Sequence, residues 1–556
     1  MSRTRNVLLA AVVMSLAALT PSAMATTGLG EAQANNPQVA GVATSDTTAR
    51  FPTNKQNEPS IAVNPVNPAL LIAGSNDEQG QPACGPGPVR GNTIASDCSF
   101  FPGVGTDGIY TSSDGGVSWT NRGLIDSQAS WAGRGVISDG DPVITYGPKP
   151  GAGGFSYANG VRAYYSSLAS IAAQKGLEFI IVSYSDDNGA TWSAPVVAST
   201  KSSSVDFNDK NWIGVDTSAS SPYFGRVYVS WTEFRSNTGT GNGNEPVMVA
   251  RSLDGGASFG APNQLSPAGN NGTGNGRQGS SITTGPDGTA YVAFEQGPSQ
   301  VVTVSRDGGS SWTRPITIGG VVDIQDPIPG ANFRTASFPT IAADPRAGST
   351  TVYTAWATRT AAGGRIVVAT STDRGAHWSA PVTVSGAQGY AFFQGLDVAP
   401  NGRVDLAWQS LTAVDPTTFG TGNAAIDTYA ATKVAGGAWA APVKLTAVSS
   451  DPAVSAQNNL QRQFWGDYNT VVSGPNNAWV IFTDSRRGAG CPDVDAYQKY
   501  LVANGLVIRS DGADRLSQRQ TGVNPALSDP SVKPAPPTAC PAQFGNTDVV
   551  VARFTP

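Results

Sequence analysis

Histidine is nearly missing from this 556-residue chain, in which His377 is the only one. A Ser-His-Asp triad, a Cys-His pair and a histidine-ligated metal each need histidine at the reacting centre. We therefore expect any catalysis to depend on carboxylates, tyrosine, lysine or arginine. Hydrolysis of glycosidic bonds is the main reaction class that runs on these groups, through two carboxyl groups that act as acid and as base or nucleophile.

Candidate residues for this chemistry lie at equivalent positions in seven segments of the sequence. The pattern of each segment predicts a strand, a turn and a second strand. Aligning the first strands brings one residue of each segment to a shared position: Glu58, Asp141, Lys210, Gly279, Phe338, Phe393 and Tyr468. Close to that position, or where the second strands end, lie further candidates: Arg277, Arg334, Trp465, Asp467, Glu295 and Arg486. Acids and bases that meet at one opening shift each other's pKa values, as they do in active sites.

From this set we assign catalysis to four residues: Glu58, Asp141, Asp467 and Tyr468. Substrate binding is assigned to six: Arg277, Arg334, Arg486, Lys210, Glu295 and Trp465, the last as a platform for a sugar ring. Polar residues at strand ends also pair with one another for purely structural reasons, and that alternative stays open for each.

A repeat indicates which elements position these residues. The strings SSDGGVSW (112–119), SDDNGATW (185–192), SLDGGASF (252–259), SRDGGSSW (305–312) and STDRGAHW (371–378) share Ser-x-Asp-x-Gly-x-x-aromatic. A sixth, TKVAGGAW (432–439), keeps the glycine and the tryptophan. Each lies between two strand-like runs, so the aspartate can bind turn amides and the glycine can supply a positive φ. The repeat predicts a series of β-hairpins, with His377 as a surface residue of the fifth turn.

These strings resemble the Asp-box of the sialidase-type β-propellers, and the resemblance covers nearly the whole mature chain. It implies an all-β fold, a single propeller of four-stranded antiparallel blades with the boxes at the turns between strands 3 and 4. The seven segments give seven blades, whereas sialidases have six, and six stays open if one unit is irregular. Because strands alternate in direction, the boxes should lie on the face opposite the starts of the first strands. We expect QVAGVAT (38–44) to complete the last blade and close the ring.

Sialidases bind the carboxylate of their substrate with three arginines and use a tyrosine nucleophile assisted by a glutamate, with an aspartate as acid/base. By resemblance, Tyr468 stands in the place of that tyrosine, and Arg277, Arg334 and Arg486 are available as a substitute arginine cluster. The first arginine motif, Arg-Ile-Pro, is replaced here by QNEPSIAV, which puts Glu58 where it would repel a carboxylate. This departure favours glycans other than sialic acid.

We therefore expect a carbohydrate-active enzyme, a glycoside hydrolase rather than a lyase, that acts on a glycan or polysaccharide at the axial mouth of the propeller. The alternative is a non-catalytic propeller that binds a glycan or a protein. Carboxyl groups about 5–9.5 Å apart in the mouth would favour the enzyme. A mouth plugged by the insertions 83–108 or 488–545 would favour the binding protein.

Composition and the N-terminus limit the partners and the compartment. A net charge of −5 without a basic cluster argues against nucleic acid. Residues 1–25 resemble a secretory signal peptide, followed by a segment over 26–57 and the propeller over 58–556. We expect an extracellular or periplasmic monomer with no membrane partner, disulfides Cys84–Cys98 and Cys491–Cys540, and no cofactor. A structural Ca²⁺ on Asp77, Asp139 or Asp141 is compatible with either function.

Overall fold

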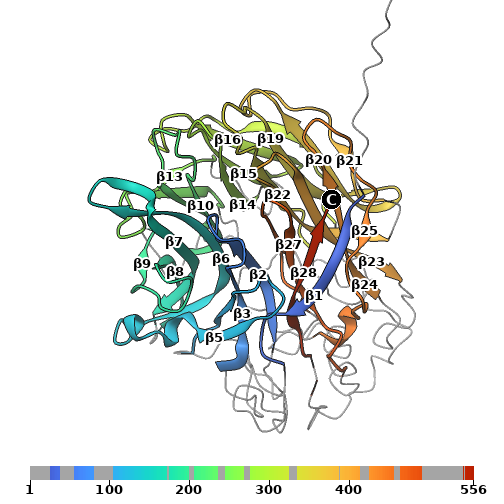
Figure 1. Cartoon of the computed structure of the whole chain (residues 1–556), viewed down its shortest axis with the longest axis horizontal. Coiled ribbons are helices and arrows are strands. Elements are labelled where there is room, and N and C mark those ends of the chain that lie inside the picture. The colour runs from blue at the N-terminus through green and yellow to red at the C-terminus, as the bar shows by residue number, and fades with distance from the viewer. Residues whose placement is uncertain are drawn as a thin grey trace, which may run out of the picture.

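The computed structural model describes residues 25–37, 55–80, 104–171, 174–199, 206–235, 244–267, 276–324, 335–386, 389–413, 425–455, 464–490, 543 and 545–556. They form seven four-stranded antiparallel sheets arranged as blades around a central axis (Figure 1). The expectation of an all-β propeller with seven blades is confirmed. The helices among these residues are single 3₁₀ turns, namely η1 (Glu78–Gly80), η2 (Ile125–Ser127), η3 (Ala129–Trp131) and η5 (Pro452–Val454).

Each of the first six blades is built from four consecutive strands. Blades 1 and 2 contain β2 (Gln56–Val63), β3 (Leu71–Asp77), β4 (Asp107–Ser112) and β5 (Thr120–Leu124), then β6 (Val136–Gly151), β7 (Gly154–Ile171), β8 (Gln174–Ser185) and β9 (Val196–Val197). Blades 3 and 4 contain β10 (Asp206–Val215), β11 (Val227–Arg235), β12 (Val247–Ser252) and β13 (Asn263–Gln264), then β14 (Arg277–Thr284), β15 (Ala290–Gln296), β16 (Ser299–Ser305) and β17 (Ile316–Gly320). Blades 5 and 6 contain β18 (Thr340–Ala343), β19 (Val352–Thr360), β20 (Gly363–Ser371) and β21 (Val382–Thr383), then β22 (Tyr390–Val398), β23 (Val404–Ala413), β24 (Ala425–Lys433) and β25 (Val443–Lys444).

Blade 7 joins the two ends of the chain. It contains β26 (Thr470–Ser473), β27 (Ala478–Asp484), β28 (Asp548–Thr555) and, at its outer edge, β1 (Thr27–Gln33), as Figure 1 shows. An N-terminal strand therefore closes the ring, but the residues differ from the prediction. The outer strand is 27–33, and the expected strand 38–44 lies outside the described residues.

Side chains reinforce this closure. Glu31 pairs with Arg486, which follows β27, and Asn35 donates a hydrogen bond to Asp548 at 2.9 Å. Thr26 contacts Thr432 of blade 6 at 3.0 Å between the two hydroxyls. Because Thr432 belongs to the box that lacks the aspartate, the N-terminal segment supplies a partner where the box has lost its own.

The five complete boxes form the turns between strands 3 and 4, as predicted. In the first, Asp114 accepts hydrogen bonds from Ser112, from the backbone N–H of Ser118 and from the Ser118 hydroxyl, the last at 2.6 Å. These bonds lower the pKa of Asp114 to about 2, the Ser118 hydroxyl contributing most. Two consecutive residues take positive φ, Gly115 at 75° and Gly116 at 82°. The Gly115 carbonyl accepts a bond from Trp479 of blade 7, so the box also joins neighbouring blades.

His377 fills the place that serine or threonine fills in the other boxes. Its backbone N–H and its Nδ1 both contact Asp373, the ring nitrogen at 2.6 Å, and its side chain is 89% exposed. The residues at this place in the other four boxes bind the box aspartate in the same way: Ser118, Thr191, Ser258 and Ser311. The prediction that His377 is a surface residue of the turn is confirmed. In all five complete boxes the side chain at this position contacts the box aspartate.

An irregularity in the innermost strands sets up the site. In five blades the first strand carries a β-bulge, with two residues facing one on the second strand. The first bulge residue always has a positive φ: Glu58 at 51°, Asp141 at 55°, Lys210 at 56°, Gly279 at 65° and Phe393 at 50°. This is the shared position found by aligning the sequence. In blades 5 and 7, Phe338 and Tyr468 occupy it just before β18 and β26 begin.

Hydrophobic packing between blades holds this ring in place. One core cluster joins blades 1 and 2 through Ile72, Ile109, Ile144 and Tyr165, and similar clusters join the other neighbours. Second strands such as β3 and β27 are buried along their whole length, as expected for strands covered on both faces. Each fully buried large apolar side chain contributes roughly 1.5–3 kcal/mol.

Candidate active site

Four carboxylates from four blades surround one lysine. The Lys210 Nζ lies 2.6 Å from Asp467 Oδ2, 3.3 Å from Asp141 Oδ2, 3.5 Å from Glu58 Oε1 and 3.9 Å from Asp209 Oδ1. We call these five residues the Lys210 cluster. Its members come from blades 1, 2, 3 and 7, so residues far apart in the sequence place their side chains at one point near the axis.

The cluster is buried, and burial shifts the pKa values of its members by different amounts. Burial, followed by the nearby charge of Asp141, raises the pKa of Glu58 well above its usual range, which favours its protonated form. Burial also raises the pKa of Asp209, to about 7, although Lys210 opposes the shift. Burial lowers the pKa of Lys210, but Asp141, Asp209, Asp467 and Glu58 together raise it well above 10.5, so the lysine is charged. A protonated acid and a lysine-bound carboxylate side by side are the pairing that acid–base chemistry needs.

Asn76 connects two members of the cluster and was not among the predicted residues. Its Nδ2 donates to Glu58 Oε2 at 2.6 Å and to Asn57 Oδ1 at 2.9 Å. Its Oδ1 accepts the backbone N–H of Asp141 at 2.8 Å. Asn76 therefore fixes both the Glu58 carboxyl and the bulge of the next blade. Asp209 was also missed, although its place directly before Lys210 was a visible signal.

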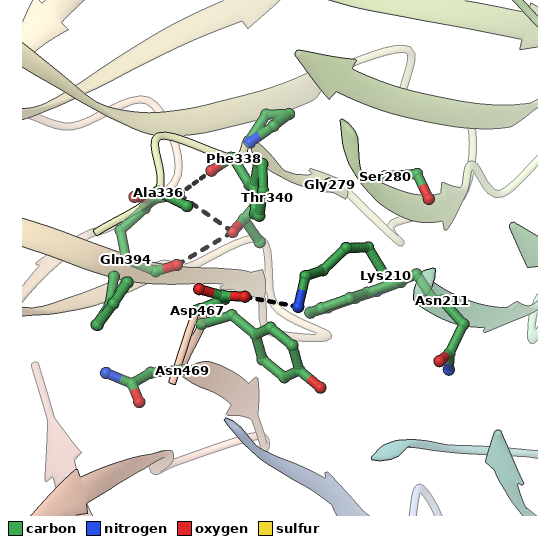
Figure 2. A pocket seen from close by; sticks show the side chains of 14 residues that line it. Lys210, Asn211, Gly279, Ser280, Ala336, Phe338, Thr340, Gln394, Asp467 and Asn469 are labelled. Carbon is green, nitrogen blue, oxygen red and sulfur yellow. Dashed lines mark hydrogen bonds and ion pairs between the residues drawn. The ribbon is translucent and has the colours of Figure 1, made fainter. Parts of the chain in front are cut away.

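A pocket opens beside the cluster, with a free volume of about 450 Å³ including the solvent at its mouth. Figure 2 shows Asp467 and Lys210 joined by an ion pair in its wall. Residues of blades 3 to 7 line it: Lys210–Trp212, Gly279, Ser280, Ala336, Phe338–Thr340, Phe393, Gln394 and Asp467–Asn469. Glu58 and Asp141 lie behind this lining and are 2% and 4% exposed.

Tyr468 lines the pocket next to Asp467. Its hydroxyl is buried and has no hydrogen-bond partner among the described residues, and its ring packs edge-on against Trp212 with 5.7 Å between centroids. Burial, followed by the charges of Asp141 and Glu58, raises its pKa well above 10. A tyrosine nucleophile needs a base within hydrogen-bonding distance of its hydroxyl. Since no described residue provides one, this geometry gives Tyr468 the properties of a neutral hydrogen-bond donor.

The predicted residues thus divide into those that meet and those that do not. The structure brings together Glu58, Asp141, Lys210, Asp467 and Tyr468. Arg486 is instead paired with Asp484 and Glu31, and Arg334 lies outside the described residues. Trp465, proposed as a sugar platform, is 1% exposed and donates its Nε1 to Gln409 at 2.8 Å, so it is part of the core.

Two further predicted residues belong to blade 4 but not to the pocket lining. Burial lowers the pKa of Arg277, and the charge of Glu245 opposes the shift. Burial raises the pKa of Glu295 well above its usual range, and Asp323 adds to the rise. The arginine cluster that a sialidase would use is therefore not assembled among the described residues.

The remaining predictions concern the cysteines, metal binding and the membrane. All four cysteines, Cys84, Cys98, Cys491 and Cys540, lie outside the described residues. In the part of the chain that is described, no group of three or more His, Cys, Asp or Glu side chains is arranged to hold a metal ion. The same residues contain no helix of the length and apolarity needed to cross a membrane.

One family model matches the central part of the chain. Residues 162–391 match the model of the BNR repeat-like domain. A search of curated proteins found no match. Solved structures similar to this chain include the Hadza microbial sialidase Hz136, with 16% identity, a TM-score of 0.37 and coverage of 58% of this chain and 60% of that one. The chain thus spans less than two thirds of that sialidase.

Two other solved structures are matched over more of their length. A protein of unknown function from Dyadobacter fermentans has 10% identity and a TM-score of 0.40, with coverage of 95% of this chain and 99% of that one. The α-L-arabinofuranosidase Arb93A from Fusarium graminearum has 12% identity and a TM-score of 0.39, with coverage of 82% and 93%. At these identities and TM-scores the likeness carries no argument about the function of this chain.

Proposed function

We propose that this chain, a sialidase-like β-propeller built from Asp-box (BNR-type) repeats, is a glycoside hydrolase whose active site is the Lys210 cluster and the adjoining pocket. The observation that carries the proposal is a pair of carboxyl groups that share one ammonium. Asp467 lines the pocket and lies 2.6 Å from the Lys210 Nζ. Glu58 lies 3.5 Å from the same nitrogen, and its burial raises its pKa and so favours its protonated form.

The separation of these two groups suggests how the bond would be cleaved. Asp467 Oδ2 lies 2.6 Å and Glu58 Oε1 3.5 Å from one nitrogen atom. The two oxygens are therefore at most about 6 Å apart, an upper limit that allows the roughly 5–5.5 Å of retaining glycosidases and lies below the roughly 6.5–9.5 Å of inverting ones.

The proposed reaction requires the buried Glu58 carboxyl to reach the pocket past Lys210. Glu58 then donates its proton to the leaving oxygen as the glycosidic bond breaks, and Asp467 bonds to the anomeric carbon. Water then attacks that carbon, gives its proton to Glu58 and releases Asp467. Lys210 orients Asp467 throughout, and Tyr468 donates a hydrogen bond to the sugar.

A screen of aryl glycosides and polysaccharides on the purified protein, with a sialyl reporter included, tests this function. Asp467→Asn and Glu58→Gln should each lower kcat/KM at least ~10²-fold, the usual contribution of a general acid or base. Tyr468→Phe should raise KM more than it lowers kcat. If Tyr468→Phe abolishes activity as completely as Asp467→Asn, the tyrosine is the nucleophile and Asp467 is not.

The burial of Glu58 and Asp141 favours a second candidate, a propeller that binds glycans without cleaving them. In that case the Lys210 cluster joins four blades and the pocket only holds its ligand. Glycan binding by a protein that hydrolyses none of the screened substrates would select this alternative.

We also propose that the protein is exported and carries the disulfides Cys84–Cys98 and Cys491–Cys540, on the basis of the N-terminal segment and the cysteine spacing. Mass spectrometry of the secreted protein, with and without reduction, would identify the N-terminus and the pairing.

A further inference from the structure

The shared ring position is charged on one side of the axis and apolar on the other. Going round the axis, it holds Glu58, Asp141 and Lys210 in blades 1 to 3, and of these three Lys210 lines the pocket. In blades 4 to 6 it holds Gly279, Phe338 and Phe393. Resting on the function proposed above, we infer that the pocket selects an uncharged sugar, with its C–H face on Phe338 and Phe393, and rejects sugars that carry a carboxylate.

The apolar half depends on one glycine. A Cβ at Gly279 would lie 2.1 Å from Cγ and 2.2 Å from Cδ1 of Phe338, so the phenyl ring fills the space where the blade 4 side chain would stand. Phe338 is half-buried and Phe393 is buried, and both line the pocket. An aromatic wall opposite a few fixed polar groups suits a ligand with one apolar face and polar edges, as a sugar ring has.

The charged half offers no free cation to an anionic ligand. Lys210 is the only lysine or arginine in the pocket lining, and its ammonium already contacts four carboxyl groups. A ligand carboxylate would have to enter beside Asp467 without a cation of its own, and an unpaired charge buried in this way is costly.

Of the four unused hydrogen-bonding groups of the lining, three are acceptors and the fourth is the Tyr468 hydroxyl, which can donate. Asn211, Gln394 and Asn469 each have a buried side-chain oxygen without a partner among the described residues. Their amide nitrogens are already committed: Asn211 to Ser166 at 3.0 Å, Gln394 to the Phe338 carbonyl at 2.7 Å and Asn469 to Gln409 at 3.1 Å. Sugar hydroxyls can donate to such oxygens, whereas an ionised carboxylate has no hydrogen to donate.

Matched substrate pairs test the inference: p-nitrophenyl glycosides of glucose, galactose and mannose, each with its 6-carboxylate counterpart, together with arabinofuranoside and sialyl reporters. For the sugar that is accepted, we expect kcat/KM to be at least ~100-fold higher for the neutral member of the pair. Phe338→Ala should raise KM for that sugar ~10-fold with a smaller change in kcat. Leu253→Ala, an exposed change in the Asp-box of blade 3, is the matched control and should alter neither constant.

Binding measured by calorimetry on the same pairs separates this inference from the proposed function. Selective binding of neutral sugars without hydrolysis would support the specificity and overturn the hydrolase. Hydrolysis of the carboxylated member at an equal or higher rate would overturn the specificity and leave the hydrolase intact. If no sugar of either kind binds, both are overturned.

Discussion

Replacing Lys210 with methionine tests whether the cluster is held together by its ammonium. Methionine keeps the apolar stem and removes the charge, so Asp467, Asp141, Glu58 and Asp209 would face one another without a counter-ion. Breaking a buried ion pair by removing one partner typically costs about 3–5 kcal/mol. Because the Lys210 Nζ lies within 3.5 Å of three carboxyl groups, we expect a loss in the upper part of that range at pH 8.

The loss should be smaller at pH 5. The pKa values of Glu58 and Asp209 are raised above those of the unfolded chain, so the protons they bind stabilise the folded state at low pH, and this stabilisation is lost as the pH rises through the folded values. Without the ammonium these pKa values rise further, and protonation relieves the repulsion in acid. The ammonium itself stays charged between pH 5 and 8, so its own titration adds nothing in this window.

Urea unfolding followed by circular dichroism at pH 5 and pH 8 measures both effects as changes in the free energy of unfolding. Lys444→Met is the matched control, because Lys444 contacts Asp427 at 2.8 Å but is 41% exposed. Such a pair contributes about 0–1 kcal/mol. If Lys210→Met is no more destabilising than Lys444→Met at pH 8, or if its cost is the same at both pH values, the electrostatic account of the cluster is wrong.

Deleting residues 25–37 removes β1 together with Glu31 and Asn35, so we expect the free energy of unfolding to fall by at least ~2 kcal/mol. The control is Leu29→Ala, an exposed change in the same strand, which should leave the free energy of unfolding nearly unchanged. His377→Ser should leave the melting temperature unchanged, because serine makes the same bonds in three other boxes; a clear drop would give the histidine a role beyond the turn. Asp209 has a folded pKa of about 7 against 3.8, so its contribution to stability should fall between about pH 4 and 7. Asp209→Asn should flatten the pH dependence of urea unfolding there by up to ~1.4 kcal/mol per pH unit, and an unchanged slope would contradict the raised pKa.

The ring position could be found from the sequence because two signals agree there. The boxes fix the phase of each blade, and the apolar pattern of the first strand fixes the register within it. Together they predicted that Glu58, Asp141 and Lys210 lie at equivalent places, and the shared bulge confirms the alignment.

The sequence could not show how each side chain is oriented or paired. Arg486 was a reasonable binding residue at the end of a second strand, but the outer strand of its own blade comes from residues 27–33 and offers Glu31. Trp465 was expected to offer a platform for a sugar ring because it lies close to the ring position in the sequence, yet its indole donates to Gln409 inside the core. Such outcomes depend on contacts between segments hundreds of residues apart.

The bulges give the most direct reason to treat this ring as functional. Four of the five bulge residues with positive φ are not glycine, and that conformation costs an L-residue roughly 1–2 kcal/mol. Gly279 shows that the fold accepts glycine at this position. Three of the other four, Glu58, Asp141 and Lys210, meet at a single point beside the pocket. Strained residues persist where their side chains are needed, so the cost at these three places argues that the cluster does more than join the blades.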